Sequence, residues 1–220
     1  YFARPDSTIN GTSVYKARKK LGKFLARDFP VKADLVSAVP YSGVASAVGY
    51  SKQSGIPYTE ILLRNRYAGR SFIMPSQEGR DQMVKMKLVP IDEEINGKEI
   101  VLIDDSIVRG TTMKQIVALL KEAGAKKIHL RISCPPIIAP CFYGVDMQQY
   151  KQFIAVEKTV EEIGKFIDVD SIAYNTIENL VEAIDIPNDR LCMACLNEDY
   201  PTELGELRAK QTKLTELNGN

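Results

Sequence analysis

Short runs of branched apolar residues alternate along this chain with segments in which apolar residues recur every three or four positions. The runs predict buried strands, and the periodic segments predict helices with one apolar face. The expected strands are 35–39, 58–63, 100–103, 127–133 and 171–174, and the expected helices are 14–27, 43–54, 77–87, 113–123, 160–166, 177–184 and 203–217. This alternation indicates an α/β fold, with a mostly parallel sheet covered by helices on both faces.

One of these strands is followed directly by two carboxylates, Asp104 and Asp105. The loop after them reaches Gly110, its flexible point, and then Thr111 and Thr112, which are suitable caps for the next helix. In open α/β sheets, ligands bind beyond the carboxyl ends of the strands. We therefore expect a ligand site at this loop.

The groups in this loop suit the two ends of one ligand. Backbone N–H groups at a helix N-terminus suit a phosphate, and carboxylates suit ribose hydroxyls or a Mg²⁺ ion. A ligand with a phosphate at one end and a diol at the other is a 5-phosphoribosyl group. A plain turn and helix cap would not explain two adjacent carboxylates followed at this spacing by Ser106, Gly110 and two threonines.

Two other segments are candidates for the same site. The loop 39–43, Val-Pro-Tyr-Ser-Gly, follows a strand and should lie at the same edge of the sheet, although a plain turn built by Pro40 and Gly43 would also explain it. The segment 64–73 carries three arginines and a tyrosine around a glycine. It could close over a pyrophosphate and exclude water, or it could be a solvated basic loop.

Composition excludes several classes of protein. The 220 residues are 45% hydrophobic, and the formal net charge of +1 disfavours a protein that coats nucleic acid or a membrane surface. We find no run of about 18 apolar residues that would span a membrane and no signal-peptide pattern, so a cytoplasmic location is expected. The chain begins at Tyr1 and not at Met, which suggests a piece of a longer protein.

Four cysteines and one histidine are the remaining candidates for chemistry. Cys192 and Cys195 have the spacing of metal ligands or of a redox pair, and the pattern alone leaves zinc, iron–sulfur, redox and no role open. Disulfides are not expected in a cytosolic chain. His129 lies inside an apolar strand and is expected to be structural.

Four motifs occur in the order found in one known family. They are Tyr1-Phe-Ala-Arg-Pro-Asp-Ser7, Arg64-Asn-Arg-Tyr-Ala-Gly-Arg70, Asp104-Asp-Ser-Ile-Val-Arg-Gly-Thr-Thr112 and Pro140-Cys-Phe-Tyr-Gly144. The third resembles the phosphoribosyl pyrophosphate (PRPP) motif of type I phosphoribosyltransferases. Together they resemble the glutamine PRPP amidotransferases. The resemblance implies the type I phosphoribosyltransferase fold and formation of 5-phosphoribosylamine and pyrophosphate from PRPP and ammonia, the first committed step of purine synthesis.

The resemblance also implies roles for individual residues. It implies catalytic roles for Arg70, Tyr67, Asp104 and Asp105. It implies PRPP binding by Asp104, Asp105, Ser106, Val108, Arg109, Gly110, Thr111, Thr112, Arg80 and Lys87. The segment 64–73 matches a lid that closes on PRPP in the family, and Tyr41 departs from the acidic residue that is more usual there.

Two cofactors follow from the resemblance. Mg²⁺ is expected on Ser42, Asp104 and Asp105. One branch of the family carries a [4Fe–4S] cluster, whose ligands match Cys141, Cys192 and Cys195, with a fourth ligand upstream of Tyr1. The cluster could therefore be incomplete or absent in this chain, and Cys134 is expected in the core.

Domain organisation and partners are further expectations. We expect a phosphoribosyltransferase domain at 1–190 and a C-terminal segment at 191–220, with the CxxC motif and a polar helix that packs back on the domain. The family has an N-terminal glutaminase domain that supplies ammonia, purine nucleotide inhibitors and homo-oligomers. Nucleic acid and membrane partners are not expected.

Two other functions are compatible with this fold. A PRPP-binding regulatory module would control transcription without catalysis and should carry a DNA-binding wing or a strongly basic face, which the balanced charge disfavours. A salvage phosphoribosyltransferase would need an aromatic pocket for a nucleobase, and the sequence shows no signature of one.

Overall fold

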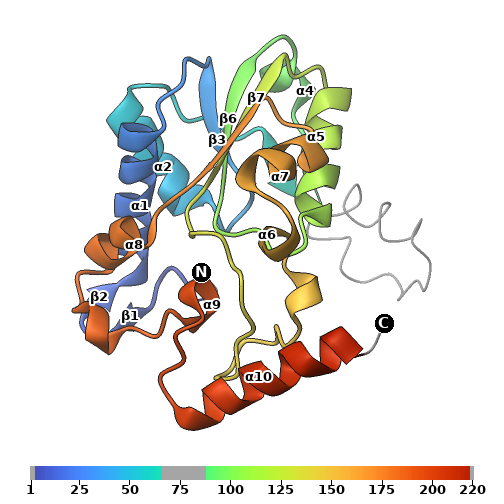
Figure 1. The fold of residues 1–220 in the computed structure, drawn as a ribbon. Coiled ribbons are helices and arrows are strands. Elements are labelled where there is room, and N and C mark those ends of the chain that lie inside the picture. The colour runs from blue at the N-terminus through green and yellow to red at the C-terminus, as the bar shows by residue number, and fades with distance from the viewer. Residues whose placement is uncertain (1–2, 66–87, 219–220) are drawn as a thin grey trace.

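The structure, a computed structural model, describes residues 3–65 and 88–218 (Figure 1). The first half contains β1 (Thr8–Ile9), β2 (Thr12–Ser13), α1 (Val14–Asp28), β3 (Leu35–Ala38), α2 (Val44–Ser54), β4 (Leu62–Arg64), β5 (Leu88–Pro90), α4 (Asp92–Ile95) and β6 (Glu99–Asp104). The second half contains α5 (Thr111–Glu122), β7 (Lys127–Ile132), η2 (Tyr150–Gln152), α6 (Ile154–Glu157), α7 (Val160–Ile167), β8 (Ser171–Tyr174), α8 (Ile177–Ile184), η3 (Asn188–Arg190), α9 (Ala194–Asn197) and α10 (Glu203–Asn218). The predicted helix 77–87 lies outside the described residues.

The central sheet has four parallel strands in the order β3-β6-β7-β8. Helix α5 connects β6 to β7, and α7 lies in the connection from β7 to β8. Parallel neighbours need such crossovers, because the chain must return to the same end of the sheet. The α/β fold predicted from the sequence is confirmed.

Helices cover both faces of this sheet, and the side chains of β6 show how. Ile100 and Leu102 belong to the core on the side of α5 and α7, whereas Val101 and Ile103 belong to the core on the side of α1 and α2. Figure 1 shows these two layers, with α8 beside α1. A strand buried on both faces reads as a continuous apolar run, as this one does.

Helices α1 and α2 approach each other closely because glycine occupies their contact positions. A Cβ on Gly22 would collide with the Ser46 carbonyl, and a Cβ on Gly49 would collide with the Lys19 carbonyl. The Ser46 hydroxyl also donates to the Arg18 carbonyl at 3.0 Å. The contact brings the start of α1 beside the loop between β3 and α2.

The predicted strand 58–63 is only partly present. Tyr58 forms a single bridge to Val36, and the regular strand β4 begins at Leu62 and pairs antiparallel with β5. Between them the Ile61 amide donates to the side-chain hydroxyl of Ser37 in β3, at 3.4 Å. The short elements β1, β2, β5, α4, α6 and α9 were not predicted, because two to four residues carry no measurable periodicity.

The C-terminal segment packs against the connection between β7 and α6. The Tyr200 hydroxyl donates to the Pro140 carbonyl at 2.8 Å. The Glu216 carboxylate, near the end of α10, accepts from the amides of Tyr150 and Lys151 at 2.9 and 3.0 Å. The domain boundary near residue 190 stays a prediction.

Candidate functional site

The site is built where β3 and β6 end side by side. The loop after β3 carries Ser42, whose hydroxyl donates to Asp104 Oδ1 at 2.7 Å. Gly43 follows, and a Cβ there would collide with the carbonyl of Ile103 at the end of β6. A residue without a side chain therefore lets the loop approach the carboxylate.

Asp104 and Asp105 form a pair of largely buried carboxylates. Asp104 is 8% exposed, and its Oδ1 also accepts from the Asp105 amide at 2.8 Å. Burial, followed by the neighbouring Asp105 carboxylate, raises the pKa of Asp104 to about 7. Burial also raises the pKa of Asp105, whose Oδ1 accepts from the Ser106 hydroxyl at 3.0 Å. Two carboxylates in this position are costly to ionise together unless a cation binds them.

The loop after the carboxylates leads directly into the N-terminus of α5. Gly110 caps this helix with φ of +76°, and no side chain bonds to the first amides. The prediction that Thr111 and Thr112 cap the helix is wrong: they are its first two residues, with exposed side chains. The cap residue Gly110 has a left-handed backbone, which glycine adopts without strain.

The rest of the loop is anchored on one side and open on the other. The Val108 carbonyl accepts from the Ile154 amide at 2.8 Å. Ile107 is buried, and Arg109 is exposed. The structure thus brings together Ser42 and the predicted residues from Asp104 to Thr112 around one loop and one helix end.

Four predicted site residues cannot be placed. Tyr67, Arg70, Arg80 and Lys87 lie outside the described residues. Their predicted roles in catalysis and PRPP binding stay predictions.

Sequence reasoning overlooked Arg18, a charged residue beside this site. It is 9% exposed, and it donates to the carbonyls of Ala3 and Ser42. A signal was present, because Arg18 lies on the same helix face as Leu21 and Leu25, which are core residues. A charged residue on an apolar helix face needs polar partners there.

All four cysteines line one cavity of about 440 Å³, together with Ala3. Cys134 is buried among apolar side chains, as expected. Cys141 and Cys195 are half-buried, and Cys192 is exposed. Within 3–65 and 88–218, however, no three His, Cys, Asp or Glu side chains form a group that could hold a metal ion.

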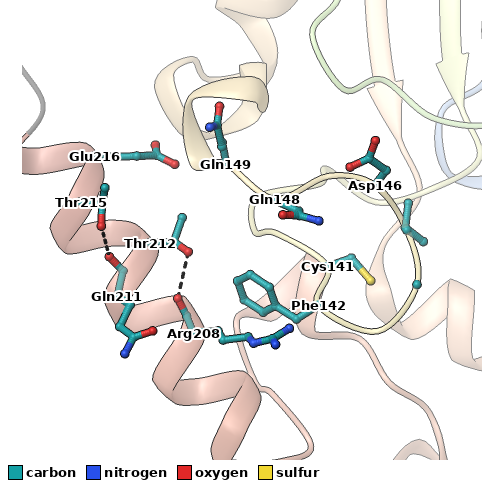
Figure 2. A pocket seen from close by; sticks show the side chains of 12 residues that line it. Cys141, Phe142, Asp146, Gln148, Gln149, Arg208, Gln211, Thr212, Thr215 and Glu216 are labelled. Carbon is teal, nitrogen blue, oxygen red and sulfur yellow. Dashed lines mark hydrogen bonds between the residues drawn. The ribbon is translucent and has the colours of Figure 1, made fainter.

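A larger, polar groove of about 790 Å³ lies between α10 and the loop 141–149 (Figure 2). The hydroxyls of Thr212 and Thr215 point along the helix and donate to the carbonyls of Arg208 and Gln211, both at 2.9 Å. Cys141 is the one predicted site residue among those that line the groove.

No helix in the described part of the chain is both long enough and apolar enough to cross a membrane.

Comparison with known proteins gives consistent matches. The family model described as the phosphoribosyl transferase domain matches residues 10–151. The amidophosphoribosyltransferase of Methanocaldococcus jannaschii is 57% identical over 204 residues, which are 93% of this chain and 43% of that protein. The amidophosphoribosyltransferase of Bacillus subtilis is 48% identical over 208 residues, 93% of this chain and 44% of that protein.

A solved structure shows the same likeness in three dimensions. The glutamine PRPP amidotransferase from Bacillus subtilis, in complex with ADP and GMP, superposes with a TM-score of 0.85 and 48% identity, over 93% of this chain and 46% of that chain. The chain spans less than half the length of these relatives.

The resemblance indicated by the four motifs is confirmed. With the matched family model and the type I fold, these findings show that the chain belongs to the phosphoribosyl transferase domain family.

Proposed function

We propose that this chain is the phosphoribosyltransferase part of an amidophosphoribosyltransferase. It would convert PRPP and ammonia into 5-phosphoribosylamine and pyrophosphate, in purine synthesis. The observation that carries the proposal is the pair of largely buried carboxylates at the end of β6, one of them bonded to the Ser42 hydroxyl. They lie next to the N-terminus of α5, where no side chain bonds to the first amides. The similarity to amidophosphoribosyltransferases over 93% of the chain supports it.

The carboxylates and the helix end have complementary tasks in this proposal. The α5 amides and the loop from Ser106 to Thr112 would bind the 5-phosphate. Asp104 and Asp105 would hold the ribose hydroxyls, so that their negative charge favours the positive charge that develops on the ring. As the bond from ribose C1 to pyrophosphate oxygen breaks, the ammonia lone pair forms the C1–N bond, and the new ammonium group loses a proton to solvent.

Mg²⁺ fits the donor set at this site. Ser42, Asp104 and Asp105 offer hard oxygen ligands, and a bound cation would favour the ionised forms of the two carboxyls, whose pKa values burial raises. Mg²⁺ would neutralise charge on the pyrophosphate leaving group. Catalytic roles for Tyr67 and Arg70, and PRPP binding by Arg80 and Lys87, are proposed from the resemblance alone, since these residues lie outside the described ranges.

Partners of the larger protein are also part of the proposal. Because relatives are more than twice as long, we infer that a glutaminase domain supplies the ammonia from glutamine. The Bacillus subtilis structure is a complex with ADP and GMP, so purine nucleotides are proposed as inhibitors. A homo-oligomer and a cytoplasmic location are proposed from the same resemblance.

We propose from the resemblance alone that an iron–sulfur cluster would bind at the cysteine cavity, because the described side chains do not by themselves form a metal-binding group. Cys141, Cys192 and Cys195 supply soft sulfur ligands around one cavity, and Ala3 at its wall shows that the N-terminal segment reaches it. A fourth ligand would come from the segment that precedes Tyr1. The cluster would tie the C-terminal segment to the domain. Iron and sulfide content, with the visible absorption of the protein extended at its N-terminus, tests this assignment.

The transferase proposal is tested by pyrophosphate release from PRPP and Mg²⁺, with and without ammonium salt at mildly alkaline pH. We expect ammonia-dependent release that Asp104→Asn/Asp105→Asn abolishes. Glu93→Gln/Glu94→Gln is the matched control, since it removes an adjacent pair of exposed carboxylates on α4. PRPP binding without turnover would contradict the proposal and favour a regulatory module.

A further inference from the structure

Arg18 is a charged side chain held inside the protein beside the proposed site. It lies on the buried face of α1, and 9% of it is exposed. A guanidinium keeps its charge at any ordinary pH, so burial must be offset by hydrogen bonds. The positions of its partners therefore indicate what the residue does.

The guanidinium joins two segments that are distant in sequence. Its Nη2 donates to the Ala3 carbonyl at 2.8 Å, and its Nη1 donates to the Ser42 carbonyl at 3.5 Å. The same Ser42 uses its hydroxyl to donate to Asp104. Arg18 thus contacts the backbone of the residue that meets the carboxylate with its side chain.

The backbone of Arg18 is itself held in place. The Ser46 hydroxyl donates to the Arg18 carbonyl at 3.0 Å, and α1 and α2 pack backbone to backbone at Gly22 and Gly49. The hydrogen bond from the Arg18 side chain to the Ser42 loop therefore comes from a backbone position that is itself held by α2.

Arg18 also lies at the cavity to which the second carboxylate belongs. Arg18, Asp105 and Ala3 line the same cavity. Arg18 is therefore placed to influence both halves of the site, the Ser42 loop and the Asp105 carboxylate.

We propose that Arg18 is a positioning residue for the PRPP and Mg²⁺ site, because its guanidinium fixes the Ser42 loop to the N-terminal segment beside Asp105. This inference rests on the proposed function. Arg18 acts through Ser42 and Asp105, and it needs no contact of its own with substrate. Groups that orient the ligands of a metal are typically needed for tight metal binding.

The first test is calorimetric titration of this chain with PRPP at several Mg²⁺ concentrations. Arg18→Met removes the charge and keeps an apolar stem, and we expect it to raise the Mg²⁺ concentration for half-maximal PRPP binding about tenfold. Arg18→Lys keeps the charge but lacks the planar guanidinium. Its Mg²⁺ concentration for half-maximal PRPP binding should lie between those of the unmodified chain and Arg18→Met. Lys20→Met, which removes an exposed charge from the same helix, should bind as the unmodified chain does.

The second test is amide hydrogen exchange without ligand, which measures the loop itself. The Gly43 amide bonds to the Val39 carbonyl at 3.1 Å and reports on the order of the loop. We expect faster exchange at Gly43 in Arg18→Met and Arg18→Lys, but not in Lys20→Met. If Arg18→Met does not fold, Arg18→Lys provides both measurements.

The outcomes separate the two proposals. If the unmodified chain binds PRPP and the Arg18 variants match it within twofold, with unchanged exchange at Gly43, the positioning role is wrong and the proposed function stands. If the unmodified chain does not bind PRPP with Mg²⁺, the proposed function fails, and the positioning role fails with it.

Discussion

At the scale of single residues, the site depends on a carboxyl group kept where ionisation is costly. Asp104 is nearly inaccessible, and its partners Ser42 and the Asp105 amide offset only part of the cost of burial. Below about pH 7 such a group favours its protonated form, and a bound cation shifts it towards the ionised form. The structure therefore links pH, Mg²⁺ and stability at one side chain.

This linkage predicts the pH dependence of stability without Mg²⁺. The pKa of Asp104 rises from 3.8 to about 7 in the folded state, so the folded state binds more protons than the unfolded state between these values. Stability should fall as pH rises through this window and stay low above it. Asp104→Asn should then raise Tm at pH 8 in a chelating buffer by about 2 °C or more, with no gain near pH 4.

Thermal melts with and without Mg²⁺ check this prediction. Mg²⁺ at pH 8 should stabilise the unmodified chain and have little effect on Asp104→Asn. An Asp104→Asn variant that melts lower than the unmodified chain at pH 8 in chelator would contradict it.

At the scale of elements, close helix packing places the loops of the site. Gly22 and Gly49 let α1 and α2 touch backbone to backbone, and Gly43 lets the loop before α2 approach the end of β6. The three glycines contact backbone carbonyl groups, which cannot change rotamer as a flexible side chain can. A methyl group at such a position must move a whole helix or strand.

We therefore expect Gly22→Ala to destabilise the protein by about 1–3 kcal/mol, although alanine favours a helix. Gly205→Ala is the matched control within α10, because its Cβ would meet the hydroxyl of Tyr143, the end of an exposed side chain that can move. Urea denaturation measures both variants. Equal stability of the two variants would show that α1 can retreat from α2 without cost.

At the scale of the whole molecule, the C-terminal helix is held by a few specific contacts. Helix α10 lies beside the connection between β7 and α6, which is far from it in sequence (Figure 1). Its leucines Leu204, Leu207 and Leu214 are exposed. The Glu216 carboxylate binds two backbone amides at the start of η2. This contact therefore attaches the helix that follows the CxxC segment to the rest of the domain.

Loss of this contact should loosen α10 without unfolding the sheet. We expect Glu216→Ala to lower stability by about 1.5–3 kcal/mol, the typical net value of hydrogen bonds to a charged group. It should also speed proteolysis within α10, measured by limited digestion and mass spectrometry. Gln211→Ala, an exposed residue of the same helix, should be cleaved like the unmodified chain.

The sequence by itself determined the alternation of strands and helices, the parallel sheet and the position of the carboxylate motif. The reason is that apolar runs and periodic faces are local patterns, and each long element carries its own. The family resemblance could be read from motifs for the same reason, because each lies in one continuous segment. Asp104 and Ser42 were both predicted in this way.

Only the tertiary structure decided which groups meet. The bond from Ser42 to Asp104 joins residues 62 positions apart, and the contact from Arg18 to Ser42 depends on glycines in two helices. The cap residue of α5 is Gly110, with a left-handed backbone, and not Thr111 or Thr112. Long-range contacts and backbone angles such as these are set by packing of the whole chain, which no local pattern contains.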